Sequence, residues 1–151
     1  MRIELANLDT EAFHALIETH AALMLSLSPP DSCHFLNIDD LRTPDVTVWE
    51  MYKETQLVGC GGLKELSSAH GEIKSMHTLD AWRGHGFGRA MLEHILQTAR
   101  SRSYQRLSLE TGSMEGFRPA RRLYELYGFV ECGPFGNYRR DPNSLFMTLV
   151  L

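Results

Sequence analysis

The sequence of 151 residues predicts a single α/β domain over residues 1–151, built on a mixed sheet in the order β-α-α-β-β-β-α-β-α-β-β. Three observations support this fold class. Short segments with strand character are interspersed with segments of helical periodicity. A strand over 71–79, a helix over 86–102 and a strand over 106–111 form one β-α-β unit, so these two strands should be parallel with a right-handed crossover. The remaining neighbouring strands are expected to form hairpins, which makes the sheet mixed.

The N-terminal third begins with a weakly alternating segment, MRIELANL, that predicts a first strand. A helix follows, with Asp9 or Thr10 available as its N-cap and apolar residues at helical spacings: Phe13, Leu16, Ile17, Leu23 and Leu27. Pro29 and Pro30 cannot continue this helix. The segment NIDDLRTP then predicts a short second helix before Pro44.

The rest of the chain alternates strands with two helices. DVTVWEMYKETQLVGCGGLKEL predicts a hairpin around the polar turn 53–56. The helix that ends near Arg102 presents Gly88, Leu92, Ile95 and Ala99 on one stripe, typical of a core-facing helix. QRLSLETG predicts a strand, and FRPARRLYELYGF predicts a helix that starts near Pro119 and stops at Gly128. FVECGPF and SLFMTLVL predict two closing strands.

Composition excludes several classes of protein. Hydrophobic content of 43% and charged content of 23% are ordinary for a soluble domain, and no apolar run is long enough to span a membrane. The N-terminal segment lacks an apolar signal core, and three widely spaced cysteines favour free thiols, so a cytoplasmic location is expected. No cysteine or histidine spacing indicates a metal site. A net charge of −4 argues against nucleic-acid binding.

Charge is unevenly distributed along the chain. Residues 1–75 carry 5 Lys/Arg and 12 Asp/Glu, whereas residues 76–151 carry 10 and 7. Charged side chains on a solvated surface would account for this distribution as readily as a functional role would. The functional interpretation is a C-terminal half that holds a polyanion and an N-terminal half that faces a cation.

The stretch Arg83-Gly84-His85-Gly86-Phe87-Gly88 opens a predicted helix with three glycines, although each glycine costs about 1 kcal/mol in a helix interior. A glycine-rich turn between a strand and a helix exposes backbone N–H groups, and the helix dipole adds positive potential at the same point. Arg83 and Arg89 flank the turn with cationic donors. The stretch therefore predicts a phosphate-binding site.

Three kinds of phosphate site are built on glycine-rich turns of this type. No lysine follows the glycines as a P-loop requires, and the third glycine lies one place too early for the G-x-G-x-x-G motif of dinucleotide folds. Arg83, Gly86 and Gly88 match R-x-x-G-x-G. In this motif the chain resembles the GNAT superfamily of N-acetyltransferases, and the resemblance extends over residues 1–151. It implies that the loop from Arg83 to Arg89 (with Gly84, His85, Gly86, Phe87 and Gly88) binds the pyrophosphate of acetyl-coenzyme A.

A second motif supports the resemblance. Ala120, Leu123, Tyr124, Gly128 and Phe129 match A-x-x-L-Y-x-x-x-G-F. The resemblance implies that Tyr124 is the general acid that protonates the departing thiolate, while Tyr127 is expected to pack in the core. Many members carry a cofactor-binding asparagine seven residues before this tyrosine, and Phe117 replaces it here.

The candidate base is a carboxylate. Thioester aminolysis requires removal of a proton from the amine, which costs roughly 4–5 kcal/mol for a lysine-like group at pH 7. By resemblance Glu72, in GEIKSM, is the leading candidate, and Glu110 at the end of the strand 106–111 is the alternative. Either could instead pair with a neighbouring cation, and water could carry the proton.

The resemblance further implies a splayed opening between the strands 71–79 and 106–111, often with a bulge in the first. Met76, His77 and Thr78 would lie at this opening and contact the cofactor. The loop GNYRRDPN is expected to overhang the acceptor pocket, where Arg139 and Arg140 could bind a carboxylate. The same arginines could equally belong to a solvated loop.

These observations predict an acetyl-CoA-dependent N-acetyltransferase that needs no metal and acts on the primary amine of a small molecule or peptide. Two alternatives remain at this point. One is a non-catalytic acyl-CoA sensor that uses the same cleft, and the other is a nucleotide-binding module. Retention of Glu72 and Tyr124 beside the glycine loop favours the enzyme. No membrane or nucleic-acid partner is expected, and a homodimer is compatible with the sequence.

Overall fold

A seven-stranded sheet in the order β1-β2-β3-β4-β5-β7-β6 organises the computed structural model, which describes residues 1–151. Only β4 and β5 are parallel, and every other neighbouring pair is antiparallel. The strands are β1 (Arg2–Leu5), β2 (Val46–Lys53), β3 (Gln56–Ser67), β4 (His70–Thr78), β5 (Arg106–Gly112), β6 (Val130–Cys132) and β7 (Ser144–Val150). The mixed sheet and the parallel β-α-β unit are as predicted.

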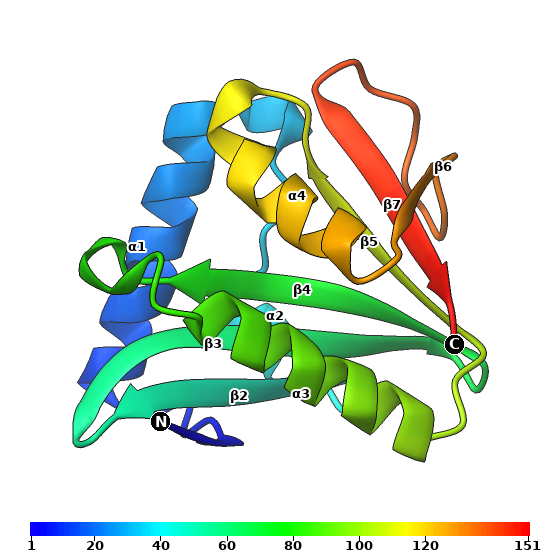
Figure 1. The fold of residues 1–151 in the computed structure, drawn as a ribbon. Helices are drawn as coiled ribbons and strands as arrows, with labels where there is room; N and C mark the ends of the chain where they lie inside the picture. The colour runs from blue at the N-terminus through cyan, green and yellow to red at the C-terminus, as the bar shows by residue number, and fades with distance from the viewer.

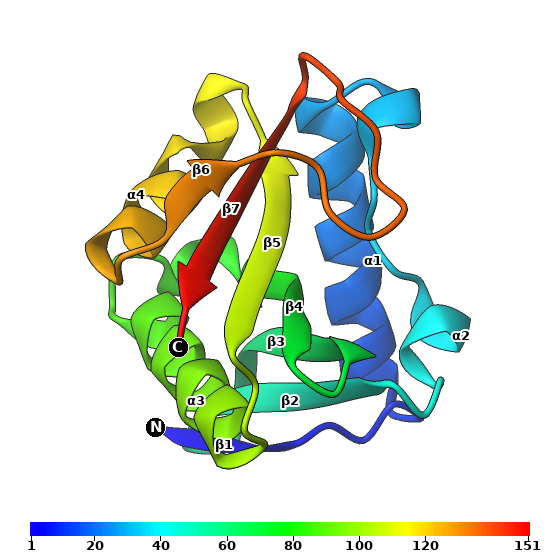
Figure 2. The same ribbon diagram turned by 90° about the vertical axis from the view of Figure 1, so that its right-hand side faces the viewer.

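Four α-helices cover the two faces of the sheet: α1 (Glu11–Leu27), α2 (Ile38–Leu41), α3 (Phe87–Ser101) and α4 (Arg118–Leu126). Figure 1 shows α3 and α4 in front of the sheet, and Figure 2 shows α1 and α2 on the opposite side. Thr10 caps α1 by accepting a hydrogen bond from the Phe13 amide. The short helix predicted in NIDDLRTP is α2, which begins with a capping box between Asn37 and Asp40.

The core is divided by the sheet. On the side of α3 and α4, 17 buried residues form one cluster that includes Met91, Leu92 and Ile95 from α3. On the side of α1, six buried residues form a smaller cluster: Phe13, Leu16, Ile17, Leu41, Val48 and Cys60. Because side chains alternate along a strand, Val48 joins the smaller cluster and Trp49 the larger. The sheet is therefore buried on both faces, and its strands are fixed in position.

The sheet opens at its centre. β4 and β5 pair only from His70–Arg106 to Glu72–Ser108, and no pair continues beyond that point. A bulge in β4 follows, where Ser75 has φ +54° and the pairing with β3 shifts between Lys74–Gly62 and His77–Cys60. The edge of β4 that faces β5 therefore has no strand partner over residues 73–78.

None of the helices combines the length and apolar character that crossing a membrane requires.

Candidate active site

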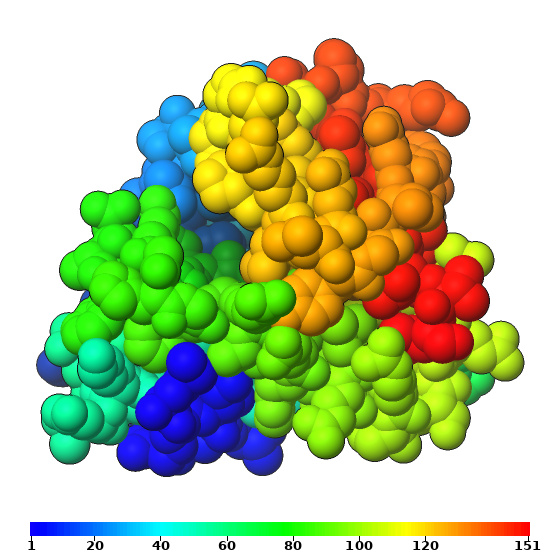
Figure 3. Space-filling view, in the orientation of Figure 1, coloured from blue at the N-terminus to red at the C-terminus, as the bar shows by residue number.

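A cavity of about 680 Å³ occupies the opening between β4 and β5. It passes through the plane of the sheet, from α1 and the segment after it to the glycine loop, the first turn of α3 and one side of α4. The space-filling view shows this face hollowed between the segment before α3 and the start of α4, with side chains of α1 visible at the bottom (Figure 3). One cavity therefore joins the two faces of the sheet.

The glycine loop forms one end of the cavity. Gly84 (φ +77°) and Gly86 (φ +87°) have left-handed backbones, and neither has a heavy atom within 4 Å of where a Cβ would lie. Gly86 precedes α3 and provides no side-chain cap, so the amides of Phe87, Gly88 and Arg89 begin the helix without intrahelical acceptors. This is the local structure that binds anions at helix N-termini.

The flanking side chains of the loop differ in their positions. Arg83 and Arg89 are exposed and line the cavity. On the surface, Arg83 forms an ion pair with Asp80 at 3.3 Å, and Arg89 lies 3.8 Å from Glu93. His85 is exposed and is absent from the cavity wall. The loop thus offers two guanidinium groups to a polyanion.

Strand β4 supplies the middle of the cavity wall. Met76 packs against the larger core cluster, His77 is buried on the side of α1, and Thr78 is half-buried, and all three line the cavity. Because the bulge at Ser75 interrupts the alternation of β4, the free backbone edge around these residues faces the opening. The structure therefore brings the predicted β4 residues to the same cavity as the glycine loop.

Tyr124 lies on the wall that α4 contributes. Its side chain is 5% exposed, lines the cavity and packs edge-to-face on Phe129 with ring centroids 5.7 Å apart. Burial raises the pKa of the Tyr124 phenol well above its usual range. Phe117 and Ala120 line the cavity from the same helix face. Tyr127 does not line the cavity. Its side chain is partly buried and packs against the larger core cluster, but its hydroxyl contacts Arg89 and Glu93 on the surface.

The two candidate carboxylates have different surroundings. Glu72 is 3% exposed, accepts a hydrogen bond of 2.6 Å from the Tyr138 hydroxyl and lies 3.4 Å from the Lys74 ammonium. It does not line the cavity. Glu110 does line it, and burial raises the pKa of Glu110 to about 7, with smaller opposing effects from Ser144 and Lys74. Of the two carboxylates, only Glu110 has access to the cavity, and its pKa lies near neutral pH.

Comparison with known proteins assigns the family. Residues 7–129 match the family model described as Acetyltransferase (GNAT) family. The chain belongs to the GNAT acetyltransferase family. Membership confirms the predicted fold and enzyme class, and it rules against the P-loop and dinucleotide interpretations of the glycine loop.

Full-length relatives agree with this assignment. The chain is 47% identical over 148 residues to the uncharacterized N-acetyltransferase YsnE of Bacillus subtilis, covering 98% of each chain. It is 44% identical over 149 residues to the uncharacterized N-acetyltransferase YedL of Escherichia coli, covering 99% of this chain and 94% of that protein. A GNAT family acetyltransferase from Elizabethkingia anophelis, solved with acetyl-CoA bound, shares the fold with a TM-score of 0.71 and 18% identity over 99% of this chain and 97% of that one.

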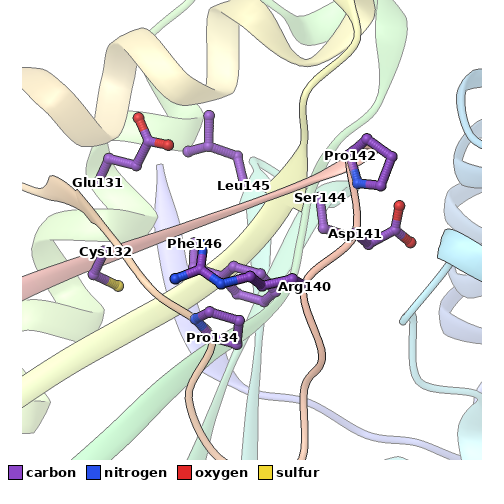
Figure 4. A pocket seen from close by; sticks show the side chains of 9 residues that line it. All are labelled: Glu131, Cys132, Pro134, Arg140, Asp141, Pro142, Ser144, Leu145 and Phe146. Carbon is purple, nitrogen blue, oxygen red and sulfur yellow. The ribbon is translucent and has the colours of Figure 1, made fainter.

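The arginines of the loop between β6 and β7 do not reach this GNAT cavity. Arg139 and Arg140 are exposed, and Arg140 lines a separate cavity of about 310 Å³ beside Glu131, Asp141 and Phe146 (Figure 4). Tyr138 is the residue of this loop that points toward the candidate site, where its hydroxyl contacts Lys74 and Glu72. Of the two alternatives for Arg139 and Arg140, this arrangement favours the solvated loop, because both side chains are exposed and neither lines the GNAT cavity.

Two buried histidines complete the GNAT cavity, and sequence reasoning missed their pairing. The Nδ1 atoms of His20 on α1 and His77 on β4 are 3.0 Å apart, and both rings line the cavity. Burial lowers the pKa of both rings to about 4, so one neutral ring donates to the other. His20 continues the helical spacing of the buried residues Phe13, Leu16 and Ile17. This spacing is the feature of the sequence that indicates an inward-facing position for His20.

The histidine pair predicts an acid-sensitive fold. The unfolded chain protonates these rings near pH 6.5 and the folded chain only near pH 4, so the unfolded state binds more protons between these values. The contribution of the histidine pair to the free energy of unfolding should be constant above this window and fall as the pH drops through it, by about 3 kcal/mol for one ring taken alone. Urea unfolding at pH 7.5 and pH 5 measures the loss.

The double variant His20→Leu/His77→Met is the control for this prediction. It removes both titrating rings and keeps apolar volume, so its unfolding free energy should fall less from pH 7.5 to pH 5 than that of the wild type. The other titrating groups, including Glu110 with its raised pKa, contribute equally to both proteins. The same pH dependence in both proteins would contradict the assignment.

Proposed function

We propose that this GNAT protein transfers the acetyl group of acetyl-CoA to a primary amine by direct attack of the amine on the thioester. The observation that carries the proposal is the single cavity that joins the glycine loop to Glu110 through the opening between β4 and β5. An acetyl-CoA bound from the side of α3 and an amine bound from the side of α1 would meet at this opening. Tyr124 lines the same cavity.

The features of the loop fit the pyrophosphate of CoA. Gly84 and Gly86 leave open space at their Cα atoms, so a phosphate oxygen can approach the backbone closely. The N-terminal amides of α3 supply donors, and Arg83 and Arg89 supply positive charge. The free edge of β4 over residues 76–78 offers backbone donors and acceptors to the pantetheine arm and to the oxyanion of the tetrahedral intermediate.

Gly86→Val should weaken CoA binding by at least about tenfold, which corresponds to about 1.4 kcal/mol. Valine at φ +87° strains the backbone, and its side chain would occupy the space through which the phosphate approaches. Gly136→Val is the matched control, because Gly136 also has positive φ (+57°) and open space but lies outside the cavity. Calorimetric titration with CoA measures both. Equal affinities in two folded variants would contradict a phosphate role for the loop.

We assign the base to Glu110 in preference to Glu72. Glu110 accepts a proton from the substrate ammonium, which leaves a neutral amine to attack the thioester, and its pKa of about 7 leaves a substantial ionised fraction at neutral pH. Glu72 lies at the last paired position of β4, and its carboxylate is occupied by Tyr138 and Lys74. It therefore supports the site as a positioning residue.

Tyr124 is proposed to donate its proton to the departing thiolate as the carbon–sulfur bond breaks. Burial disfavours the phenolate, and it also raises the basicity of a thiolate formed in the same desolvated cavity. The phenol therefore stays protonated until the thiolate forms. The amine nitrogen gains the acetyl group and loses a second proton, which restores the Tyr124 phenol. Glu110 holds the proton it took from the ammonium, and CoA leaves as the thiol.

Thiol release from acetyl-CoA, together with mass spectrometry of the acceptor, tests the proposed function across a panel of primary amines. Amine-dependent thiol release with a mass gain of one acetyl group is the expected result. Tight acetyl-CoA binding without transfer to any amine would instead support the non-catalytic sensor. Failure to bind acetyl-CoA would overturn both.

A further inference from the structure

The cavity exposes more apolar than polar surface, and the end next to α1 carries one group of apolar side chains. Half-buried or buried side chains from α1, from the segment after it and from the start of α4 form this group: Leu23, Met24, Leu27, Phe35 and Phe117. We call these five residues the acceptor wall. An acceptor bound here exchanges water for hydrocarbon over much of its surface, which favours an apolar body.

Lys74 is the only cation at this end, and its ammonium is already occupied. Its three N–H donors are matched by three partners: the His34 carbonyl at 3.1 Å, the Tyr138 hydroxyl at 2.9 Å and the Glu72 carboxylate at 3.4 Å. Together Lys74 and Glu72 form a neutral, buried pair. A carboxylate on the acceptor would have to displace one of these contacts, at the cost of leaving a buried group unpaired.

The other ionisable groups at this end are neutral at physiological pH. Burial lowers the pKa of His20 and, with Lys74, that of His34, so both rings are uncharged. Burial and Glu110 raise the pKa of the Cys33 thiol, which donates to backbone carbonyls of α1 and the following turn. Glu110 is consequently the single unpaired acid that an acceptor meets.

One unpaired acid in an apolar wall defines a class of acceptor. We propose that the acceptor is a primary monoamine on an aromatic or aliphatic body that carries no carboxylate and no second cation. This inference rests on the proposed function of the same cavity. The single ammonium of such a molecule is matched by Glu110, and its body covers the acceptor wall. A carboxylate would lie unpaired near Glu110, and a second ammonium would lie unpaired against hydrocarbon.

Two pairs of acceptors separate charge from size. Phenylalaninol carries a hydroxymethyl group where phenylalanine carries a carboxylate. 1,5-Diaminopentane carries a second ammonium group that pentylamine lacks. With the wild-type protein and saturating acetyl-CoA, kcat/KM should be at least about 100-fold higher for phenylalaninol than for phenylalanine, and higher for pentylamine than for the diamine. Equal or better turnover of phenylalanine or of the diamine would overturn the inference and leave the proposed function intact.

A substitution in the acceptor wall provides a gain-of-function test. Leu23→Arg places a guanidinium on the wall and should raise the phenylalanine-to-phenylalaninol ratio of kcat/KM at least tenfold. Leu25→Arg is the matched control, because Leu25 is on the same helix, is 49% exposed and does not line the cavity. An equal shift of the ratio in both variants would contradict the assignment of the wall.

The outcome in which none of these amines is acetylated is also informative. In that case the binding of N-acetylphenylalaninol and N-acetylphenylalanine to the CoA-loaded wild-type protein is compared by calorimetry. Preference for the uncharged product supports the inference, whereas equal or reversed affinities overturn it. A protein that does not bind acetyl-CoA fails the proposed function itself.

Discussion

Tyr124→Phe should reduce kcat by about 10²–10⁴-fold, the usual contribution of a general acid, while CoA affinity changes little. The substitution removes one hydroxyl from a side chain that is 5% exposed and keeps the ring packed against Phe129. The cavity loses its proton donor to the thiolate without losing shape. Steady-state thiol release and calorimetric CoA titration measure the two quantities separately.

Tyr127→Phe is the matched control on the same helix end. The Tyr127 hydroxyl contacts Arg89 and Glu93 at the surface and does not line the cavity, so its removal should leave kcat within a few-fold of wild type. Arg89 borders the glycine loop, so a small change in CoA affinity is compatible with this prediction. A large loss of kcat in Tyr127→Phe with normal turnover in Tyr124→Phe would show that the motif misplaces the acid. Normal turnover in both variants would indicate protonation by water.

Glu110→Gln should lower kcat/KM by about 10²–10⁴-fold near neutral pH and change the shape of the pH profile. In the wild type, activity should rise as the pH increases through about 7, because the Glu110 carboxylate must be ionised to accept a proton. The variant lacks this limb, and its activity should follow only the titration of the amine. Part of the loss is therefore recovered at high pH, where more of the amine is already neutral.

Glu72→Gln distinguishes the two carboxylates. Glutamine can still accept the Tyr138 hydrogen bond but leaves Lys74 without its counter-charge, so the expected effect is a loss of unfolding free energy of about 3 kcal/mol or less. The pH profile should keep its limb near pH 7. Loss of that limb in Glu72→Gln, with an unchanged profile in Glu110→Gln, would return the role of base to Glu72.

The helices and strands of this protein and the position of its two family motifs can be predicted from the sequence alone. Helices α1, α3 and α4 follow from apolar spacings and from local signals such as the Thr10 cap and the Gly128 stop. The glycine loop and Tyr124 are recognisable because each motif is contiguous and lies at a defined end of a helix. These features depend on interactions between residues a few positions apart, which a pattern in one sequence records directly.

The surroundings of the ionisable residues depend on the assembled fold, because their partners lie far away in the chain. Glu72 and Glu110 look equivalent in sequence. In the structure Glu72 pairs with Ser108, which is the last parallel pair between β4 and β5. Glu110 lies two residues beyond Ser108 on β5, where the two strands have separated. Tyr138, 66 residues from Glu72, occupies the first carboxylate and leaves the second facing the cavity. Likewise His20 and His77 meet across 57 residues, and Arg140 turns to a different cavity. Burial and pairing set the charge of each group, and both are properties of the assembled fold.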